Sequence, residues 1–184
     1  GTFNPIHYGH LRCAEEVREA LGFDAVLFMP LFFSPHKEDK ELIGAEKRIE
    51  MAGIAIKGNP GFSVSDIEIK RKGVSYSIDT IKSLKAKTNA EIFWVVGSDI
   101  IAEFNRWKNS EELIKEATFL VFPRDPYDLP KNLPKGFKLV ETPTLQVANF
   151  SSTVIRQRIK EGKTIKYLVS EKVERYIKEN NLYV

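Results

Sequence analysis

Short apolar runs alternate along this chain with segments in which apolar residues recur at helical spacing. Three runs are uninterrupted, at residues 25–29, 92–96 and 119–122. Apolar character returns at 137–140, after a proline-rich stretch, 123–136, which we interpret as a surface loop. Continuous apolar character is typical of strands covered on both faces, and parallel strands need a crossover between them. The alternation therefore predicts an α/β fold built on an open, doubly wound parallel sheet, with two helices at the C-terminal end.

The helical segments are marked by apolar residues three and four positions apart. In the first segment Leu11, Ala14 and Val17 fall on one face, and Gly22 is suited to end a helix. We expect helices at about residues 10–21, 45–56, 78–87, 111–117, 152–160 and 171–179.

One predicted strand is irregular. Phe62 and Val64 alternate in one phase, and Ile67 and Ile69 alternate in the other. This change of phase predicts a single strand with a bulge near residues 65–66.

The length of 184 residues suits one compact domain, so we expect residues 1–184 to form a single domain. No apolar run approaches the ~20 residues needed to cross a bilayer. Cys13 is the single cysteine and cannot form an internal disulfide, which favours a reducing cytoplasm. The net charge of +3 suits a protein that handles phosphorylated small molecules but is too small to indicate a nucleic acid partner. Assembly into a homo-oligomer is left open.

Residues 1–10 combine small and turn-forming residues with two histidines three positions apart, His7 and His10. At the start of a helix, backbone N–H groups and the positive end of the helix dipole favour an anion, and both imidazoles can face one site. Gly9 allows a nucleotide to approach the backbone closely. A purely structural pair of histidines is the alternative.

A second anion site is predicted where a later helix begins. Ser151, Ser152 and Thr153 give three consecutive hydroxyls, and Arg156 follows one turn later. One hydroxyl is enough to cap a helix, so the triple run with an arginine indicates a phosphate cradle of hydroxyl, N–H and guanidinium donors. Plain helix capping is the alternative.

These two segments resemble the HxGH loop of a nucleotidyltransferase superfamily and the SSTxIR signature of its adenylyltransferases. Further segments occur in the order typical of bacterial nicotinate-nucleotide adenylyltransferases, so the resemblance spans essentially the whole chain. They are residues 34–37, 73–80 and 97–99, Trp107, Arg124 and residues 173–183. The resemblance implies a Rossmann-like nucleotidyltransferase fold and the transfer of the adenylyl group of ATP to nicotinate mononucleotide, giving nicotinate adenine dinucleotide and pyrophosphate in NAD biosynthesis.

The chain departs from that family at a few positions. It has Asn4 where the family usually has aspartate, Ser34 in place of proline, Ser77 in place of threonine and Phe150 in place of isoleucine. Only the change at residue 4 removes a charge, so a role for an acid there does not carry over. The family also has a short hydrophobic strand before Gly1, and we expect the natural protein to carry it.

The resemblance implies that His7 and His10 contact the ATP phosphates, with His10 nearest the α-phosphate. Lys37 reaches in from a loop, and with Arg156 these are the expected catalytic residues. Asp99 is expected to accept hydrogen bonds from ribose hydroxyls, with helix capping as the alternative. The other residues expected to bind ATP are Gly1, Thr2, Phe3, Gly9, Gly97, Phe150, Ser151, Ser152, Thr153 and, again, Arg156.

The resemblance also implies a mononucleotide site formed by Asn4, Lys37, Tyr76, Ser77, Thr80, Trp107 and Arg124. Trp107 offers a flat face to a pyridinium ring, although a place in the core is the alternative. Mg²⁺ is expected to arrive with ATP, because this ion keeps most of its waters and no acidic cluster in the sequence looks like a metal cage. No metal-ligating residue is predicted.

Three other functions compete with this interpretation. A pantetheine-phosphate adenylyltransferase would share the first motif but would not need an aromatic platform for the acceptor. A nucleotide-sensing protein would keep the pocket without turnover. A class I aminoacyl-tRNA synthetase is a weaker alternative, because the chain has no KMSKS-like loop and no room for an anticodon domain.

Overall fold

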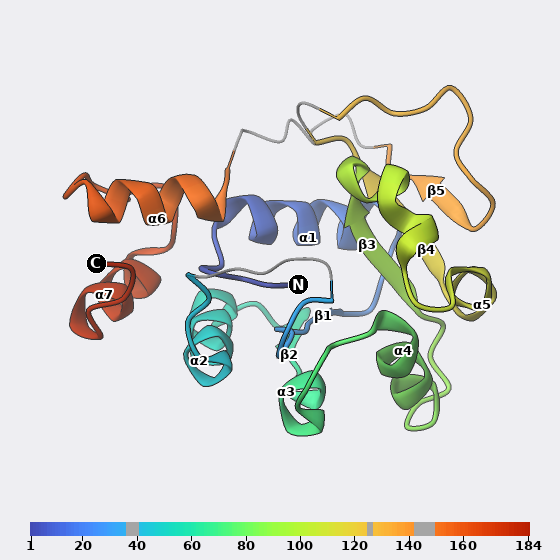
Figure 1. The fold of residues 1–184 in the computed structure, drawn as a ribbon, viewed down its shortest axis with the longest axis horizontal. Coiled ribbons are helices and arrows are strands. Elements are labelled where there is room, and N and C mark those ends of the chain that lie inside the picture. The colour runs from blue at the N-terminus through green and yellow to red at the C-terminus, as the bar shows by residue number, and fades with distance from the viewer. Residues whose placement is uncertain (36–40, 125–126, 142–149) are drawn as a thin grey trace. The chain divides into compact units, whose positions relative to one another are not determined.

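The computed structural model describes residues 1–35, 41–124, 127–141 and 150–184, and the chain divides into two compact units (Figure 1). The first unit comprises Gly1–Val74 and Thr144–Val184, and the second comprises Ser75–Pro143. The middle of the chain therefore forms one unit, while its two ends together form the other.

The first unit contains a parallel pair of strands, β1 (Val26–Phe28) and β2 (Phe62–Val64), with Val26 opposite Phe62. Beyond β1 the pairing continues through Gly1, whose carbonyl accepts the Leu31 N–H at 2.9 Å. The helices of this unit are α1 (Tyr8–Ala20), α2 (Ala45–Ile56), α3 (Ile67–Arg71), α6 (Ser152–Lys160) and α7 (Glu171–Glu179).

One hydrophobic core joins the helices and strands of the first unit. α2 packs against β2 and against α7, with Met51 completely buried. Ile6, just before α1, and Ile155 on α6 belong to the same cluster and are also buried. Segments that are far apart in the sequence are thereby fixed around the start of α1.

Arg48 on α2 is the largest fully buried side chain of the chain's described part. Its guanidinium donates hydrogen bonds to the carbonyls of Thr2 at 2.8 Å, Phe32 at 3.1 Å and Ile43 at 3.1 Å. A buried charge costs free energy unless it is hydrogen-bonded, and a planar guanidinium can serve several acceptors at once. Arg48 therefore ties three loop segments to α2.

The second unit contains three parallel strands in the order β3–β4–β5. They are β3 (Phe93–Gly97), β4 (Thr118–Phe122) and β5 (Phe137–Leu139), with Phe93 opposite Thr118 and Phe119 opposite Phe137. The helices are α4 (Ser77–Lys85), the 3₁₀ helix η1 (Ser98–Arg106) and α5 (Ser110–Glu116).

An aromatic cluster forms the centre of the second unit's core. The ring of Phe104 on η1 packs against those of Phe119 and Phe137, with centroids 4.9 and 4.7 Å apart. All three are buried, together with Ile81 of α4. This core holds η1, which follows directly after β3, against β4 and β5.

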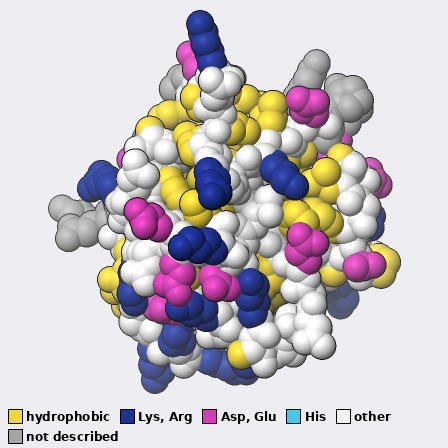
Figure 2. Space-filling model, turned by 90° about the vertical axis from the view of Figure 1, so that its right-hand side faces the viewer, with side chains coloured by type: hydrophobic (Ala, Val, Ile, Leu, Met, Phe, Trp, Pro, Cys, Tyr) yellow, Lys and Arg dark blue, Asp and Glu magenta, His cyan; other side chains and the backbone are white. Residues whose placement is uncertain are grey.

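Basic and acidic side chains are intermixed on the face shown in Figure 2. Ion pairs link α4 to α5, with Lys82 Nζ 2.6 Å from Glu112 and Lys85 Nζ 2.8 Å from Glu116. These pairs lie at the surface and contribute little to stability individually. In the described ranges, no helix is long and apolar enough to cross a membrane.

Most sequence expectations about the elements are confirmed. Every strand pairing of the described residues is parallel, and the six predicted helices all exist. The expected strand through Ile67 and Ile69 is wrong, because both residues lie in α3. There Lys70 N–H bonds the Asp66 carbonyl at 2.8 Å and the Lys70 ammonium pairs with the Asp66 carboxylate, so local helical contacts override the alternation of the isoleucines.

Replacing Arg48 by alanine should destabilise the first unit strongly. The carbonyls of Thr2, Phe32 and Ile43 would lose a charged donor, at roughly 1–3 kcal/mol for each that stays buried, so we expect the free energy of unfolding to fall by about 3 kcal/mol or more. Urea denaturation measures this, with Lys57→Ala at an exposed position as the control. A loss below about 1 kcal/mol would contradict the role given to Arg48.

Candidate active site

His7 and His10 lie together at the start of α1. His7 is the N-cap residue, and its backbone N–H donates to Nδ1 of His10 at 3.2 Å. The two imidazole rings are stacked, with centroids 3.6 Å apart and planes 19° apart. Phe3 packs edge-on against His10 at 5.0 Å, so the pair is held from the loop side as well.

Gly9 allows the start of α1 to lie close to Phe150, two residues before α6. A Cβ atom on Gly9 would lie only 2.8 Å from Cβ of Phe150 and 3.1 Å from Nδ1 of His7. Any larger residue would force these groups apart, because separations of this kind are below van der Waals contact. Gly9 is therefore required by the close approach of two segments that are 141 residues apart in the sequence.

The start of α6 faces the loop that precedes α1. Ser152 donates its hydroxyl hydrogen bond to the Pro5 carbonyl at 2.9 Å. Ser151 is the N-cap residue, yet its side chain makes no capping bond within the described chain. Within those same residues the backbone N–H groups of Ser152, Thr153 and Gly9 have no acceptor. Two helix starts thus offer N–H and hydroxyl donors, the groups that bind an anion.

Arg156 lies one turn into α6 and is buried. Its Nη1 donates to the carbonyl of Asn4 at 2.9 Å, and its Nε donates to Oε2 of Glu41 at 2.8 Å. Together with the Ser152 hydrogen bond to Pro5, this means that α6 donates to two consecutive carbonyls of the loop before α1. Arg156 supplies a fixed positive charge behind the helix start.

Glu41 is a residue of this region that the sequence did not single out. Its carboxylate contacts Lys160 as well as Arg156, and these two contacts, in that order of size, lower the pKa of Glu41 to about 2. The contact with Arg156 joins residues 115 positions apart. A local sequence pattern contains no signal for such a pair.

Asn4 is buried and both ends of its amide are bonded. Nδ2 donates to the Glu41 carbonyl at 3.1 Å, and Oδ1 accepts the hydroxyl hydrogen of Tyr183 at 2.9 Å. An aspartate could not make the first bond, since a carboxylate has no donor. These two hydrogen bonds explain why an asparagine suits this position. The peptide bond between Asn4 and Pro5 is cis.

Of the three residues that open the chain, Gly1 and Thr2 are held away from the histidines, whereas Phe3 contacts His10. Gly1 pairs with Leu31, and the Thr2 carbonyl accepts from Arg48. Phe3 adopts a left-handed φ of 48° and places its ring against His10.

A second group of expected site residues lies at the carboxyl ends of β3 and β4. Nη1 of Arg124 is 3.2 Å from Oδ2 of Asp99, while a Cβ on Gly97 would overlap Oδ1 of Asp99. Ser98 belongs to the 97–99 motif, but no role was predicted for it from the sequence; it accepts the Arg124 N–H at 2.9 Å and donates to the Tyr127 carbonyl at 2.8 Å. Open α/β sheets bind ligands at this edge.

Asp99 keeps one unused acceptor in this arrangement. Its Oδ1 atom is buried and has no hydrogen-bond partner among the residues that the structure describes. A buried acceptor without a donor costs free energy, so a ligand hydroxyl would find a favourable partner there.

The residues expected at the pyridine ring surround the start of α4. Tyr76 is the N-cap residue, and the Lys108 ammonium lies over its ring, 4.4 Å from the centroid. Ser77 is the first helical residue. Thr80 is fully buried and its hydroxyl donates to the Tyr76 carbonyl at 3.3 Å, so it supports Tyr76 from within the unit.

Trp107 follows η1 and is partly buried. Its ring lies 5.6 Å from Phe104 and 6.2 Å from Phe119, at the margin of the aromatic core. The structure therefore gives the tryptophan a packing role, and the ring keeps some exposed surface.

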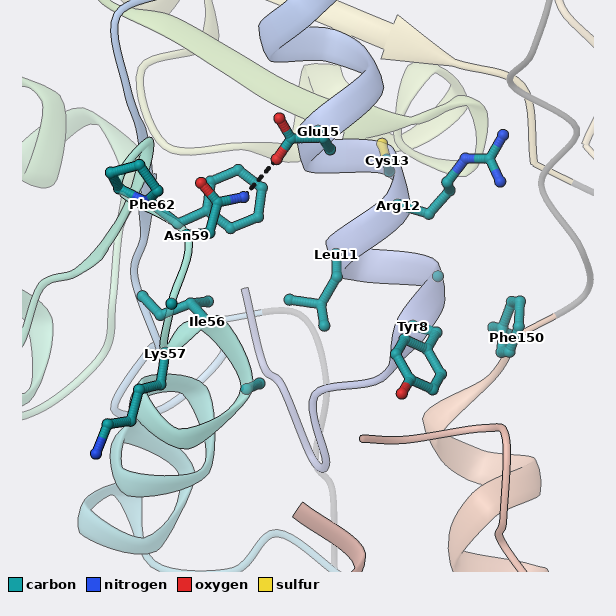
Figure 3. Close-up of a pocket in the computed structure, with 14 residues that line it drawn as sticks. Tyr8, Leu11, Arg12, Cys13, Glu15, Ile56, Lys57, Asn59, Phe62 and Phe150 are labelled. Atoms are coloured by element: carbon teal, nitrogen blue, oxygen red, sulfur yellow. Dashed lines mark hydrogen bonds between the residues drawn. The ribbon is translucent and has the colours of Figure 1, made fainter. Parts of the chain in front are cut away.

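A cavity of about 730 Å³ lies between α1 and the segment that joins α2 to β2 (Figure 3). Leu11 projects from α1 toward Ile56, and Glu15 is hydrogen-bonded to Asn59 across the cavity. Gly9 and Phe150 line it as well, so the cavity reaches the place where α1 and α6 begin.

The donors at this site suit phosphate oxygens better than a metal ion. N–H groups, hydroxyls and imidazoles surround the starts of α1 and α6, and no group of three His, Cys, Asp or Glu side chains in the described part of the chain is arranged to hold a metal. Lys37 lies outside the described residues.

Comparisons with known proteins agree on the kind of chain this is. The cytidylyltransferase-like family model matches residues 1–158. A "probable nicotinate-nucleotide adenylyltransferase" of Methylacidiphilum infernorum is 39% identical over 188 residues, covering 100% of this chain and 89% of the relative. A protein of the same name from Lactiplantibacillus plantarum is 40% identical over 184 residues, covering 100% of this chain and 85% of the relative.

Solved structures agree on the fold. The nicotinic acid mononucleotide adenylyltransferase of Plasmodium falciparum, in complex with NaAD, has a TM-score of 0.83 at 24% identity and covers 100% of this chain and 94% of that one. At this identity the likeness establishes the fold alone, which is the Rossmann-like nucleotidyltransferase fold expected from the sequence.

Glu41→Gln should remove a stabilisation that depends on pH. Because the contacts with Lys160 and Arg156 lower the Glu41 pKa from 4.5 to about 2, the carboxylate stabilises the folded state above about pH 4.5, and this contribution is lost as the pH falls toward about 2. We expect the wild type to melt at a higher temperature than the variant near pH 6, as measured by calorimetry, with the difference shrinking at lower pH. Glu171→Gln, at an exposed glutamate of α7, is the control. A difference that stays constant with pH would speak against the ion pair.

Proposed function

We propose, from the premise that this chain belongs to the cytidylyltransferase-like family and to its nicotinate-nucleotide adenylyltransferases, that it transfers the adenylyl group of ATP to nicotinate mononucleotide in NAD biosynthesis. The products are nicotinate adenine dinucleotide and pyrophosphate. The observation that carries this proposal is the pair of helix starts at Gly9 and Ser152, which present donors to one anion-binding region beside His7 and His10.

The reaction needs no nucleophile from the protein. The second pKa of a phosphate monoester is about 6, so the mononucleotide phosphate is mostly a dianion at neutral pH. One of its oxygens forms a bond to the α-phosphorus of ATP, while the bond from that phosphorus to the bridging oxygen breaks and pyrophosphate leaves. The protein's task is to position the two phosphates and to offset the negative charge that develops.

We assign the triphosphate to the starts of α1 and α6. His7 and His10 contact the phosphates, with His10 nearest the α-phosphate, and Ser151, Ser152 and Thr153 donate to the β- and γ-phosphates. The charge of Arg156 acts from behind the start of α6, where Asn4 and Glu41 hold its guanidinium. Lys37 is proposed to reach the same phosphates.

The remaining ATP contacts are proposed for residues other than those at the two helix starts. The buried Oδ1 of Asp99 is suited to accept a ribose hydroxyl hydrogen bond beside Gly97. Gly1, Thr2 and Phe3, which open the chain, are proposed to complete the ATP site together with Phe150.

The residues proposed to bind the mononucleotide are Asn4, Lys37, Tyr76, Ser77, Thr80, Trp107 and Arg124. Trp107 stacks on the pyridinium ring, and N–H groups at Tyr76 and Ser77 hold the carboxylate. Thr80 supports Tyr76, and Arg124 contacts the phosphate. The Tyr76 ring is itself packed against the Lys108 ammonium, which adds positive charge near the place proposed for the carboxylate.

Mg²⁺ is proposed to enter with ATP, where it would bind phosphate oxygens and keep part of its own water shell. It would offset phosphate charge during the transfer. We assign it no ligand from the chain.

We also propose a cytoplasmic location, which agrees with a single cysteine whose burial raises its pKa to about 12 and keeps it unreactive. Nucleic acid and membrane partners are not proposed, and a homo-oligomer is left open.

Replacing His10 by alanine should lower kcat by about 10²-fold, since a preorganised donor to a developing charge is worth that much, while the fold survives. Arg156→Ala should raise KM for ATP as well, because its charge already acts on the ionised ground state. Release of pyrophosphate from ATP and nicotinate mononucleotide measures both, with Arg12→Ala on the exposed face of α1 as the control. Near-normal turnover in the His10 variant would remove its proposed role.

The acceptor should be the acid rather than the amide. N–H donors at the start of α4 satisfy a carboxylate, whereas an amide NH₂ would face donors at a cost of roughly 1–3 kcal/mol, or about 5- to 150-fold in kcat/KM. Trp107→Ala should raise KM for either pyridine nucleotide far more than KM for ATP, with Trp94→Ala, a partly buried tryptophan of β3, as the control. Equal efficiency with acid and amide acceptors would refute the carboxylate site, and phosphopantetheine as a third acceptor tests the rival transferase.

A further inference from the structure

Glu41 is a charged residue to which the proposed mechanism gives no contact with a substrate. Its side chain is 40% exposed, whereas that of its partner Arg156 is 8% exposed. The carboxylate therefore lies between the buried guanidinium and the solvent. It also contacts Lys160, one turn further along α6, so it bridges two cations of one helix.

The bond from Glu41 determines where the rest of the guanidinium points. A guanidinium is planar and its donors form a rigid fork, so fixing Nε also fixes the direction of Nη1. Nε of Arg156 donates to Oε2 of Glu41 at 2.8 Å, and Nη1 then donates to the carbonyl of Asn4 at 2.9 Å. The Glu41 carboxylate thus acts on Asn4 through Arg156.

Glu41 also holds Asn4 through its own backbone. The Glu41 carbonyl accepts from Nδ2 of Asn4 at 3.1 Å. Asn4 lies three residues before His7, and the following residue, Pro5, is held by Ser152. The loop that leads into the two histidines is therefore fixed on one side by α6 and on the other by Glu41.

We propose that Glu41 is a positioning residue, which orients Arg156 and so fixes the loop that places His7 and His10. Its effect on turnover rests on the proposed function, whereas its effect on the loop does not.

Two variants separate positioning from simple charge. Glu41→Ala removes the carboxylate but keeps the backbone carbonyl that Asn4 needs, and we expect kcat to fall about 10-fold, because small displacements of catalytic groups cost this much or more. Glu41→Gln keeps a neutral acceptor for Arg156, and we expect kcat within about 3-fold of the wild type. Glu171→Ala on α7 is the control for loss of an exposed carboxylate. Normal turnover in Glu41→Ala, or equal losses in both variants, would overturn the proposal.

A double-mutant cycle with His10→Ala tests the route of the effect. If Glu41 acts by placing the histidines, Glu41→Ala should change kcat by less than about 2-fold once His10 is absent. If Glu41 acted independently of the histidines, the loss of kcat in Glu41→Ala would be the same with and without His10, so the two losses would multiply. Losses that multiply would therefore overturn the proposal.

Hydrogen exchange followed by mass spectrometry gives a readout that needs no activity. In Glu41→Ala, the peptide covering residues 4–10 should exchange about 5-fold faster or more, while peptides of the second unit stay unchanged. Unchanged exchange at residues 4–10 would overturn the proposal even in an inactive chain. If the wild type releases no pyrophosphate, but residues 4–10 exchange faster in Glu41→Ala as expected, the proposed function alone would be refuted.

Discussion

A loop that offers N–H groups to a ligand must have its carbonyl groups bonded elsewhere, and this constraint organises the first unit. The carbonyls of Gly1, Thr2, Asn4 and Pro5 accept hydrogen bonds from Leu31, Arg48, Arg156 and Ser152 respectively. These acceptors are thereby turned toward the protein. Because negative oxygen atoms near a phosphate would repel it, directing them inward makes the loop compatible with an anion.

Two buried arginines share this task in different ways. Arg48 binds three backbone carbonyls, so it holds loops together at the base of the unit. Arg156 binds one carbonyl and one carboxylate, so it couples the loop to a charged surface residue. A lysine could replace neither, since a single ammonium has no planar fork with which to reach separated acceptors in fixed directions. The buried charges thus serve the geometry of the loop before α1.

The sequence predicted the parts of this arrangement that depend on local patterns. The sequence located α1 and α6, and the short motifs around His7 and Ser152 marked the two helix starts to which we assign the triphosphate, because the residues involved are neighbours in the chain. The region after β2 was mispredicted, since alternation at Ile67 and Ile69 is outweighed by the turn at Asp66. Glu41 and Ser98 were missed because their partners lie 115 and 26 positions away. The 3₁₀ helix η1 was missed as well, although Ile100, Ile101 and Phe104 have the spacing of one helix face.

The division of the chain has a consequence for how its chemistry could diversify. Residues 75–143 form a compact unit with its own aromatic core and carry most of the residues proposed to recognise the acceptor, while the histidines and the serine run belong to the other unit. Each core is built from its own residues, so substitutions that retune the acceptor need not repack the core around α1 and α6. Under the proposed assignment, substitutions within residues 75–143 could change the acceptor while the residues assigned to the triphosphate stay the same.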